Sequence, residues 1–313
     1  MNSDPRTQSI EVERTTKLYL DLLKLCLTDF IYIDDPMSLM VPYRRVRRAD
    51  LLHHIFVWPL IAMLRRFGIE AVQPNHQRFF DYRRLSSAQI KQLRSIGGDW
   101  PPRAHTMIGL KRLDNLQHCV ETVLRDEIPG DLIETGVWRG GASIFMKGVL
   151  DARGDKKRRV WLADSFQGLP PPDPAKYPAD KDWNFHKSPE LAISRSTVEQ
   201  NFRAYGLFDD RVRFLEGWFK DTLPKAPIDR IAVLRMDGDL YESTTHVLDA
   251  LYAKLSPGGF LIVDDFVLPP CRSAVDDFRR KHAISEPIVG IDGIGAYWRK
   301  SAQAESALPN PAA

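Results

Sequence analysis

The sequence predicts an α/β protein built around a mostly parallel, seven-stranded sheet with helices on both faces. From about residue 104 to 299, short apolar stretches alternate with longer stretches of helical periodicity. This alternation is typical of βαβ units. The strand candidates are apolar along most of their length, as expected of strands that helices cover on both sides. The two C-terminal candidates lie close together and are expected to form an antiparallel pair at one edge.

The predicted elements follow one another in a regular order. The strand candidates are residues 131–135, 159–165, 211–217, 231–238, 259–266, 287–292 and 295–300. The helical candidates between them are "GGASIFMKGVLDARG", "SRSTVEQNFRAYGL", "STTHVLDALYAKLSPGG" and "CRSAVDDFRRKHAI". Residues 1–100 are predicted to form a helical cap, because "TTKLYLDLLKLCLTDFIYI" has apolar residues at helical spacing and no clear strand precedes residue 130. Residues 301–313 are predicted to be a disordered tail.

One connection is longer and more polar than the others. Residues 168–190, "GLPPPDPAKYPADKDWNFHKSPE", are rich in proline and charge. Loops of this length in compact domains are usually functional or disordered. We predict that this segment is a mobile lid over the site.

The bulk composition excludes few functions. The net charge of +3 is nearly balanced, and the basic cluster at residues 43–50 is too short for a nucleic-acid stripe, so no nucleic-acid partner is predicted. The three cysteines, Cys26, Cys119 and Cys271, have no metal-binding spacing and suit a reducing compartment. The polar N-terminus lacks the features of a signal peptide, so a cytoplasmic location is expected.

A membrane role is considered for residues 51–69, "LLHHIFVWPLIAMLRRFGI". Two histidines and a proline interrupt this run and two arginines close it, so no integral membrane segment is predicted. The simplest interpretation is a helix, or a pair of helices, that covers a core or an oligomer seam. Interfacial membrane contact and a part in the substrate pocket stay open as alternatives.

Acidic side chains stand at the ends of the predicted strands. Asp237 ends the fourth strand candidate, and Asp264 and Asp265 end the fifth. If these strands are neighbours, the three carboxylates converge, which suits a hard divalent cation such as Mg²⁺. Capping of a following helix would explain Asp265 or Asp239 singly, but not three together.

The first two strands are followed by features of a nucleoside site. Glu134 and the glycines of "ETGVWRGGAS" lead into a helix, where free N–H groups can hold an anion. Asp164 ends the second strand, where a carboxylate can accept hydrogen bonds from a ribose diol. Because no phosphate-binding lysine loop is present, these residues favour S-adenosylmethionine over a nucleotide. Trp218 could stack on the adenine or belong to the core.

Long stretches of the chain resemble one enzyme family, the macrocin O-methyltransferases (TylF/MycF). The resemblance covers residues 15–33 and about 95–300. It is carried by "DWPPRAHTMIGLKRLDNL", "GDLIETGVWRGGASIFMKGVL", "VWLADSFQGLP", "RMDGDLYESTTHVLDALYAKLSPGGFLIVDDF" and "GAYWRK". It implies a class I, Rossmann-like methyltransferase domain over residues 101–300. It also implies that the enzyme methylates hydroxyl groups on the sugars of antibiotics, with S-adenosylmethionine and Mg²⁺. A homo-oligomer is implied as well, with the N-terminal helices at the subunit interface.

The resemblance also implies roles for individual residues. The implied cofactor contacts are Met107, Glu134, Gly136, Ser143, Asp164, Ser165 and Trp218. The implied Mg²⁺ ligands are Asp237, Asp264 and Asp265, with Asp237 also the general base. Catechol-type methyltransferases place a lysine where this chain has Leu240. The chain departs from the family at an insertion of about residues 34–94.

The expected reaction is methyl transfer to one of two adjacent hydroxyls that bind the metal, with Asp237 taking the proton. The expected acceptor is a small-molecule glycoside. A polysaccharide, a glycolipid or a non-sugar diol is the alternative acceptor. An inactive cofactor-binding protein is the alternative from another functional class.

Overall fold

A single mixed sheet organises the described part of the computed structural model, residues 5–33 and 86–301. The seven strands are β1 (Asp131–Thr135), β2 (Val160–Asp164), β3 (Val212–Glu216), β4 (Ile231–Met236), β5 (Leu255–Val263), β6 (Val289–Gly290) and β7 (Ala296–Arg299). Their order across the sheet is β3-β2-β1-β4-β5-β7-β6. Neighbours from β3 to β5 pair in parallel, whereas β7 is antiparallel to both β5 and β6. The predicted fold class is therefore confirmed.

Strand β5 begins earlier than the sequence pattern predicts. The stretch "LSPGG" was expected to end a helix, yet it forms the first part of β5, with Leu255 paired to Ile231. The register then shifts, so that Phe260 pairs with Val233. Proline and glycine mark a turn by local preference, but they are also tolerated where a strand is bulged. Tertiary pairing decides the boundary here.

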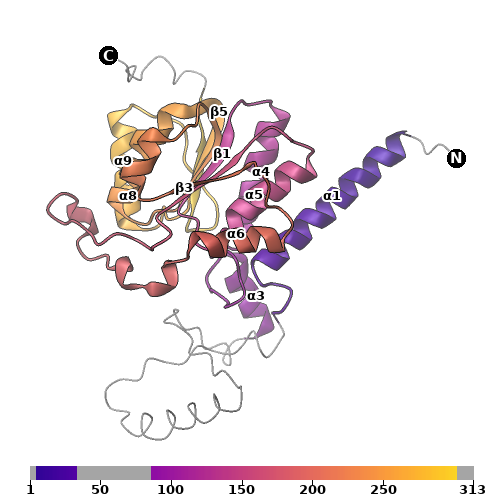
Figure 1. Ribbon diagram of the computed structural model, residues 1–313, viewed down its shortest axis with the longest axis horizontal. Coiled ribbons are helices and arrows are strands. Elements are labelled where there is room, and N and C mark those ends of the chain that lie inside the picture. Colours follow the sequence, from indigo (N-terminus) through magenta and orange to yellow (C-terminus); the bar gives the residue numbers. More distant parts are fainter. Residues whose placement is uncertain (1–4, 34–85, 302–313) are drawn as a thin grey trace, which may run out of the picture.

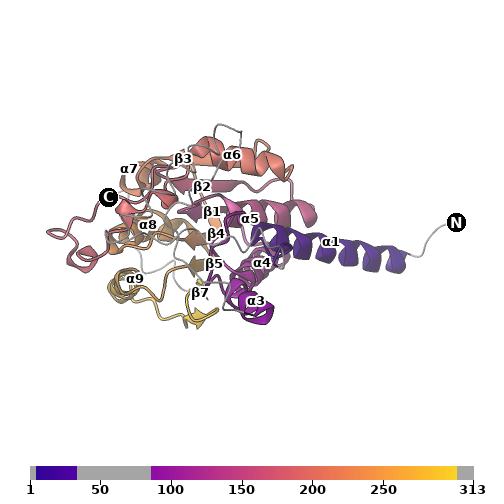
Figure 2. The ribbon, with the colours of Figure 1, turned by 90° about the horizontal axis from the view of Figure 1, so that it is seen from below.

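Helices cover both faces of the sheet. The helices are α1 (Pro5–Leu27), α3 (Ser87–Ser95), α4 (Leu110–Arg125), α5 (Gly141–Ala152), α6 (Arg195–Ala204), α7 (Phe219–Thr222), α8 (Tyr241–Leu251) and α9 (Pro269–Lys281). In Figure 2 the strands lie between α8 and α9 on one side and α1, α4 and α5 on the other. The buried core divides in the same way, because successive strand residues such as Leu132 and Ile133 pack into opposite clusters.

The long N-terminal helix packs onto the sheet domain with its C-terminal half. Leu20, Leu23 and Leu27 are buried against α5 and α4, while Ile10 and Val12 are exposed near its other end. Figure 1 shows this helix projecting from the side of the domain. No helix within the described ranges is long and apolar enough to cross a membrane.

Several expectations fall outside the described residues. These are the nature of the 51–69 segment, the basic cluster at residues 43–50, and most of the tail and of the 34–94 insertion. The last part of that insertion forms α3, which has a complete capping box between Ser86 and Gln89. The 168–190 segment contains three short 3-10 turns, and its mobility stays a prediction.

Candidate active site

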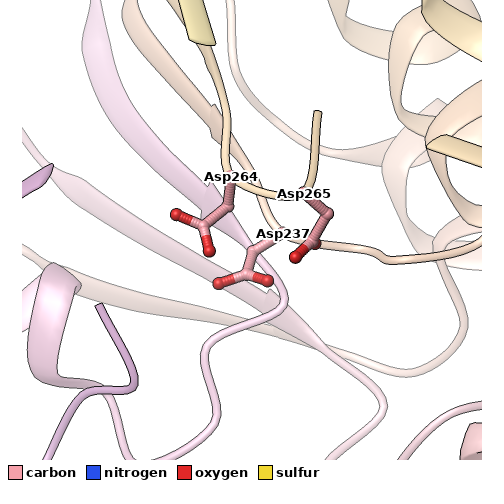
Figure 3. A group of neighbouring side chains, drawn as sticks. All are labelled: Asp237, Asp264 and Asp265. Carbon is pink, nitrogen blue, oxygen red and sulfur yellow. The ribbon is translucent and has the colours of Figure 1, made fainter. Parts of the chain in front are cut away.

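Three carboxylates converge at the carboxyl edge of the sheet. Asp237 follows β4, and Asp264 and Asp265 follow β5. Because β4 and β5 are parallel neighbours, their ends meet at the same edge. One oxygen of each carboxylate lies within 4.8 Å of an oxygen of the other two. Figure 3 shows the three side chains pointing toward one another.

Two buried arginines form ion pairs with the carboxylates of this cluster. Nη1 of Arg235, on β4, lies 2.6 Å from Glu134 Oε1 and 2.9 Å from Asp237 Oδ2. Its Nη2 lies 2.7 Å from Asp264 Oδ1. Arg112, on α4, donates to Asp264 Oδ2 at 2.6 Å and to Asp292 at 2.9 Å. Arg235 therefore connects side chains from three adjacent strand ends.

The cluster has the properties of a divalent-cation site. Its carboxylates outnumber the two guanidinium groups. They are Glu134, Asp237, Asp239, Asp264 and Asp265. The buried Oδ1 of Asp264 lies 2.7 Å from Nη2 of Arg235, in an ion pair. An all-oxygen donor set of several carboxyl groups fits Mg²⁺.

A glycine brings the loop after β1 against the turn after β4. Gly136 has a φ of +85°, which favours glycine, and a Cβ at this position would lie 1.7 Å from the backbone oxygen of Asp237. The backbone N–H of Asp237 donates to the carbonyl of Thr135 at 2.8 Å. The loop before α5 and the first predicted metal ligand are thus in direct contact.

Glu134 and Ser143 form a buried pair beneath this loop. The Ser143 hydroxyl, on α5, donates to Glu134 Oε2, while Arg235 binds the other carboxylate oxygen. Glu134 lines the adjoining cavity, whereas Ser143 is fully buried and does not. Ser143 is therefore placed to orient Glu134 from behind.

Asp164 is fixed by backbone donors at the end of β2. Its two oxygens accept from the N–H groups of Val137 and Phe166, each at 2.8 Å. Each carboxylate oxygen has a further lone pair, so Asp164 is oriented by the backbone and can still accept a hydrogen bond from a ligand. The neighbouring Ser165 hydroxyl donates to the carbonyl of Gly168 at 2.6 Å.

A cavity of about 910 Å³ lies over these residues. This is near the upper end for small-molecule sites, about 300–1,000 Å³. Loops after β1, β2, β4 and β5 line its floor, and the 168–190 segment contributes apolar wall residues. The wall residues of that segment include Leu169, Pro170, Pro171, Trp183 and Phe185.

Comparison with known proteins shows what this fold and site belong to. The family model of macrocin-O-methyltransferase (TylF) matches residues 16–300. This chain belongs to the TylF family. The enzymes of that family are O-methyltransferases, and this TylF-family chain is one as well.

Two curated relatives and one solved structure are closely similar to this TylF-family chain. The 8-demethyl-8-(2,3-dimethoxy-alpha-L-rhamnosyl)-tetracenomycin-C 4'-O-methyltransferase of Streptomyces olivaceus is 48% identical over 95% of this chain and 97% of its own. Mycinamicin III 3''-O-methyltransferase of Micromonospora griseorubida is 56% identical over 69% of this chain and 86% of its own. The O-methyltransferase NovP has a TM-score of 0.72 at 42% identity, covering 91% of this chain and 99% of that structure.

Burial raises the pKa values of the carboxyl groups in the TylF-family site, and neighbouring arginines oppose it. Burial raises the pKa of Glu134 to about 7, against the opposing effect of Arg235. Burial and the charges of Asp237 and Asp264 raise the pKa of Asp239 to about 8. Burial and neighbouring carboxylates also raise the pKa of Asp237 and Asp265. For Asp264 burial acts in the same sense, but Arg112 and Arg235 outweigh it and lower its pKa.

Most of the predicted site residues lie around one cavity. Met107, Trp218 and Ser165 line it together with the strand-end residues already described, while Ser143 lies behind it. The side chain of Trp218 is partly exposed, and its stacking on adenine stays a prediction. Leu240, at the position of the catechol-type lysine, is buried with 1% of its surface exposed.

Sequence reasoning missed the two arginines, the buried Asp180 and one residue of the cavity wall, His246. Arg235 had a visible signal, because a charged residue inside the apolar strand "IAVLRMDG" needs a partner. Arg112 and Asp180 had none, since their partners come from distant segments. His246, on α8, lines the cavity and lies 3.3 Å from the Tyr177 hydroxyl.

Proposed function

We propose that this O-methyltransferase uses S-adenosylmethionine and Mg²⁺ to methylate a hydroxyl of a sugar on a glycosylated natural product. The observation that carries the proposal is the convergence of Asp237, Asp264 and Asp265 beside the loop that follows β1. The relatives support the acceptor class, because their names specify a 4' oxygen of a rhamnosyl-tetracenomycin and a 3'' oxygen of a mycinamicin.

The floor of the cavity divides into two halves with different tasks. Glu134, Gly136, Asp164 and Ser165 adjoin the methyl-donor half, where S-adenosylmethionine supplies the methyl group. Asp164 is preoriented by two backbone N–H groups and would accept from the ribose hydroxyls. Gly136 lines the cavity, and its lack of a side chain lets the loop after β1 pack against Asp237.

Asp237, Asp264 and Asp265 would hold the metal in the other half. A cation held there would supply Lewis-acid stabilisation to a hydroxyl of the acceptor and would help to orient it. Asp237 is the proposed base, because its side chain is 30% exposed and reaches the cavity, while Arg235 fixes one of its oxygens at 2.9 Å. Its role is to accept the hydroxyl proton as the oxygen takes the methyl group. Arg112 and Arg235 hold Asp264 in its charged form.

The test is a methyl-transfer assay with radiolabelled S-adenosylmethionine and a panel of acceptors. The panel contains a rhamnosylated aromatic polyketide, a glycosylated macrolide, their aglycones, and a catechol. We expect transfer to glycosides alone, loss of transfer in EDTA, and recovery with Mg²⁺. Transfer that EDTA does not diminish would remove the metal from the proposal. Methylation of the catechol or the aglycones in place of the glycosides would contradict the proposal that the acceptor is a sugar.

Two variants test the role of Asp237. Asp237→Asn should reduce turnover by about 10³-fold or more, because it removes both a metal ligand and the base. Asp249→Asn is the matched control, since Asp249 is exposed on α8 and carries the same charge change. Near wild-type turnover of Asp237→Asn in Mg²⁺ would contradict both proposed roles.

A further inference from the structure

Helix α8 begins without a capping side chain of its own. Leu240 stands at its N-cap position and makes no side-chain capping hydrogen bond. The first N–H groups of a helix have no acceptor within the helix, so they need one from elsewhere. Asp180, 61 residues earlier in the 168–190 segment, supplies it. Its Oδ1 accepts from the N–H of Tyr241 at 2.7 Å, and its Oδ2 accepts from the N–H of Glu242 at 3.0 Å.

This contact is buried and electrostatically favourable. Asp180 has 0% of its surface exposed, although exposed residues surround it in the segment. A carboxylate at a helix N-terminus is stabilised by the helix dipole and by charge-assisted hydrogen bonds. Asp180 therefore anchors the middle of the segment to one point on the domain.

On one side, the anchored helix end continues directly into the turn of the carboxylate cluster. Asp237 and Asp239 lie in the few residues before α8. Asp239 has a φ of +56°, a conformation that costs free energy in residues other than glycine. Its N–H donates to Asp265 Oδ2 at 3.2 Å. Such a turn persists only where its surroundings hold it, and the anchored start of α8 is one such constraint.

On the other side, the anchor sets the wall of the cavity. The N–H of Trp183 donates to the carbonyl of Asp180 at 3.0 Å, and the rings of Trp183 and Phe185 pack 5.4 Å apart. Both rings line the cavity. Tyr177, three residues before the anchor, lies against His246 of α8. One carboxylate thus connects the wall of the cavity to the turn at its floor.

We propose that Asp180 is a positioning residue for methyl transfer. It holds the turn of Asp237 and Asp239 and the Trp183–Phe185 wall in a fixed relation, so that the metal ligands and the acceptor are presented together. The part of this inference that concerns metal affinity rests on the proposed Mg²⁺ site. The part that concerns the turn and the wall rests on the contacts alone.

The first test compares Asp180→Asn with Asp182→Asn by hydrogen–deuterium exchange. An asparagine can accept through one oxygen but turns an N–H₂ group toward the second backbone donor. Asp182 is exposed in the same segment and undergoes the same charge change. We expect exchange of peptides covering 237–243 and 176–185 to become about tenfold faster in Asp180→Asn and to stay unchanged in Asp182→Asn. Wild-type exchange of 237–243 in Asp180→Asn would overturn the proposal.

The second test measures ligand affinities of the same variants. Mn²⁺ titrated under electron paramagnetic resonance serves as the metal probe, and calorimetry gives the Kd of S-adenosylmethionine. Asp180→Asn should raise the Mn²⁺ Kd by about tenfold and leave the donor Kd within about twofold, because Asp164 is held by the N–H groups of Val137 and Phe166 at a different strand end. An unchanged Mn²⁺ Kd, or an equal loss of both affinities, would contradict the positioning role. If the wild type binds no Mn²⁺, the proposed metal site fails, and the exchange test decides the role of Asp180.

A measurement on the wild type keeps the inference testable if Asp180→Asn does not fold. The N–H groups of Tyr241 and Glu242 bond to the segment, whereas that of Thr244 bonds to the helix carbonyl of Leu240 at 3.0 Å. We expect Tyr241 and Glu242 to exchange in step with residues 180–183. Exchange in step with Thr244 and the rest of α8 would overturn the proposal.

Discussion

Arg235 Nη2 lies 2.7 Å from Asp264 Oδ1. Because Arg235 lies within β4 and Asp264 follows β5, this ion pair links the two neighbouring strands. The same guanidinium reaches Glu134, which is its direct partner in the register of β1 and β4. The side chain of Arg235 is only 2% exposed. The buried guanidinium of Arg235 offsets the repulsion among the neighbouring carboxylates at the ends of β1, β4 and β5.

Removal of this cation should be strongly destabilising. Arg235→Met keeps most of the volume but leaves Glu134, Asp237 and Asp264 without a shared partner. We expect the free energy of unfolding to fall by about 3–5 kcal/mol, as is usual when one partner of a buried ion pair is removed. Urea unfolding followed by circular dichroism measures it. Arg272→Met is the control, because Arg272 is exposed and pairs with Asp276 at 3.8 Å, and a loss below about 1 kcal/mol is expected there. Equal losses in the two variants would contradict the structural role of Arg235.

The contact between Gly136 and Asp237 predicts a large difference between two glycine substitutions. In Gly136→Ala the added Cβ would lie 1.7 Å from a backbone oxygen, so the loop or the turn must move. In Gly154→Ala φ is also positive, at +75°, but no atom lies within 4 Å of the added carbon. We expect a loss of about 1 kcal/mol for Gly154→Ala, from backbone strain alone. We expect several times that loss for Gly136→Ala. Similar melting temperatures of the two variants would show that the close approach has no energetic weight.

Ser143 should affect the methyl donor through Glu134. Ser143→Ala leaves a buried oxygen of Glu134 without its donor, at a cost to stability of about 1–3 kcal/mol. The donor Kd should rise in Ser143→Ala, and the same substitution should have little further effect in a Glu134→Gln background. Calorimetry on the two single variants and the double variant tests this coupling. Additive effects would instead indicate that Ser143 acts on the donor independently. Ser196→Ala, at an exposed site on α6, is the control.

The raised pKa values predict how stability depends on pH when no metal is bound. Glu134, at about 7, and Asp239, at about 8, bind protons more tightly in the folded protein than in the unfolded one. Folding therefore takes up protons between their ordinary pKa values and these raised values, so their contribution to stability is lost as pH rises from about 5 to 8. The melting temperature in EDTA should fall over this range, and the fall should be smaller in Asp239→Asn. Mg²⁺ should raise the melting temperature at pH 8 far more than at pH 5.5. An equal Mg²⁺ effect at both pH values would count against this account.

The fold could be predicted from the sequence because most of its strands and helices have a clear local pattern of apolar residues. Each strand candidate is a short apolar run between helical stretches, and the structure shifts most boundaries by only one or two residues. The exception is β5, whose start depends on pairing with β4. The convergence of the strand-end carboxylates could also be predicted from the sequence, since parallel neighbouring strands bring their ends together. The roles of Arg112 and Asp180 could not be predicted, because a contact across 152 or 61 residues leaves no local pattern.

The close packing of Gly136 on Asp237 also bears on enzyme engineering. The loop after β1 and the turn after β4 touch with no room for a side chain between them, so a change in one displaces the other. The wall formed by residues such as Leu169, Trp183 and Phe185 has no such constraint at its cavity face. A library intended to retarget this enzyme to new acceptors should therefore diversify that wall, keep Asp180, and leave the floor of the site unchanged.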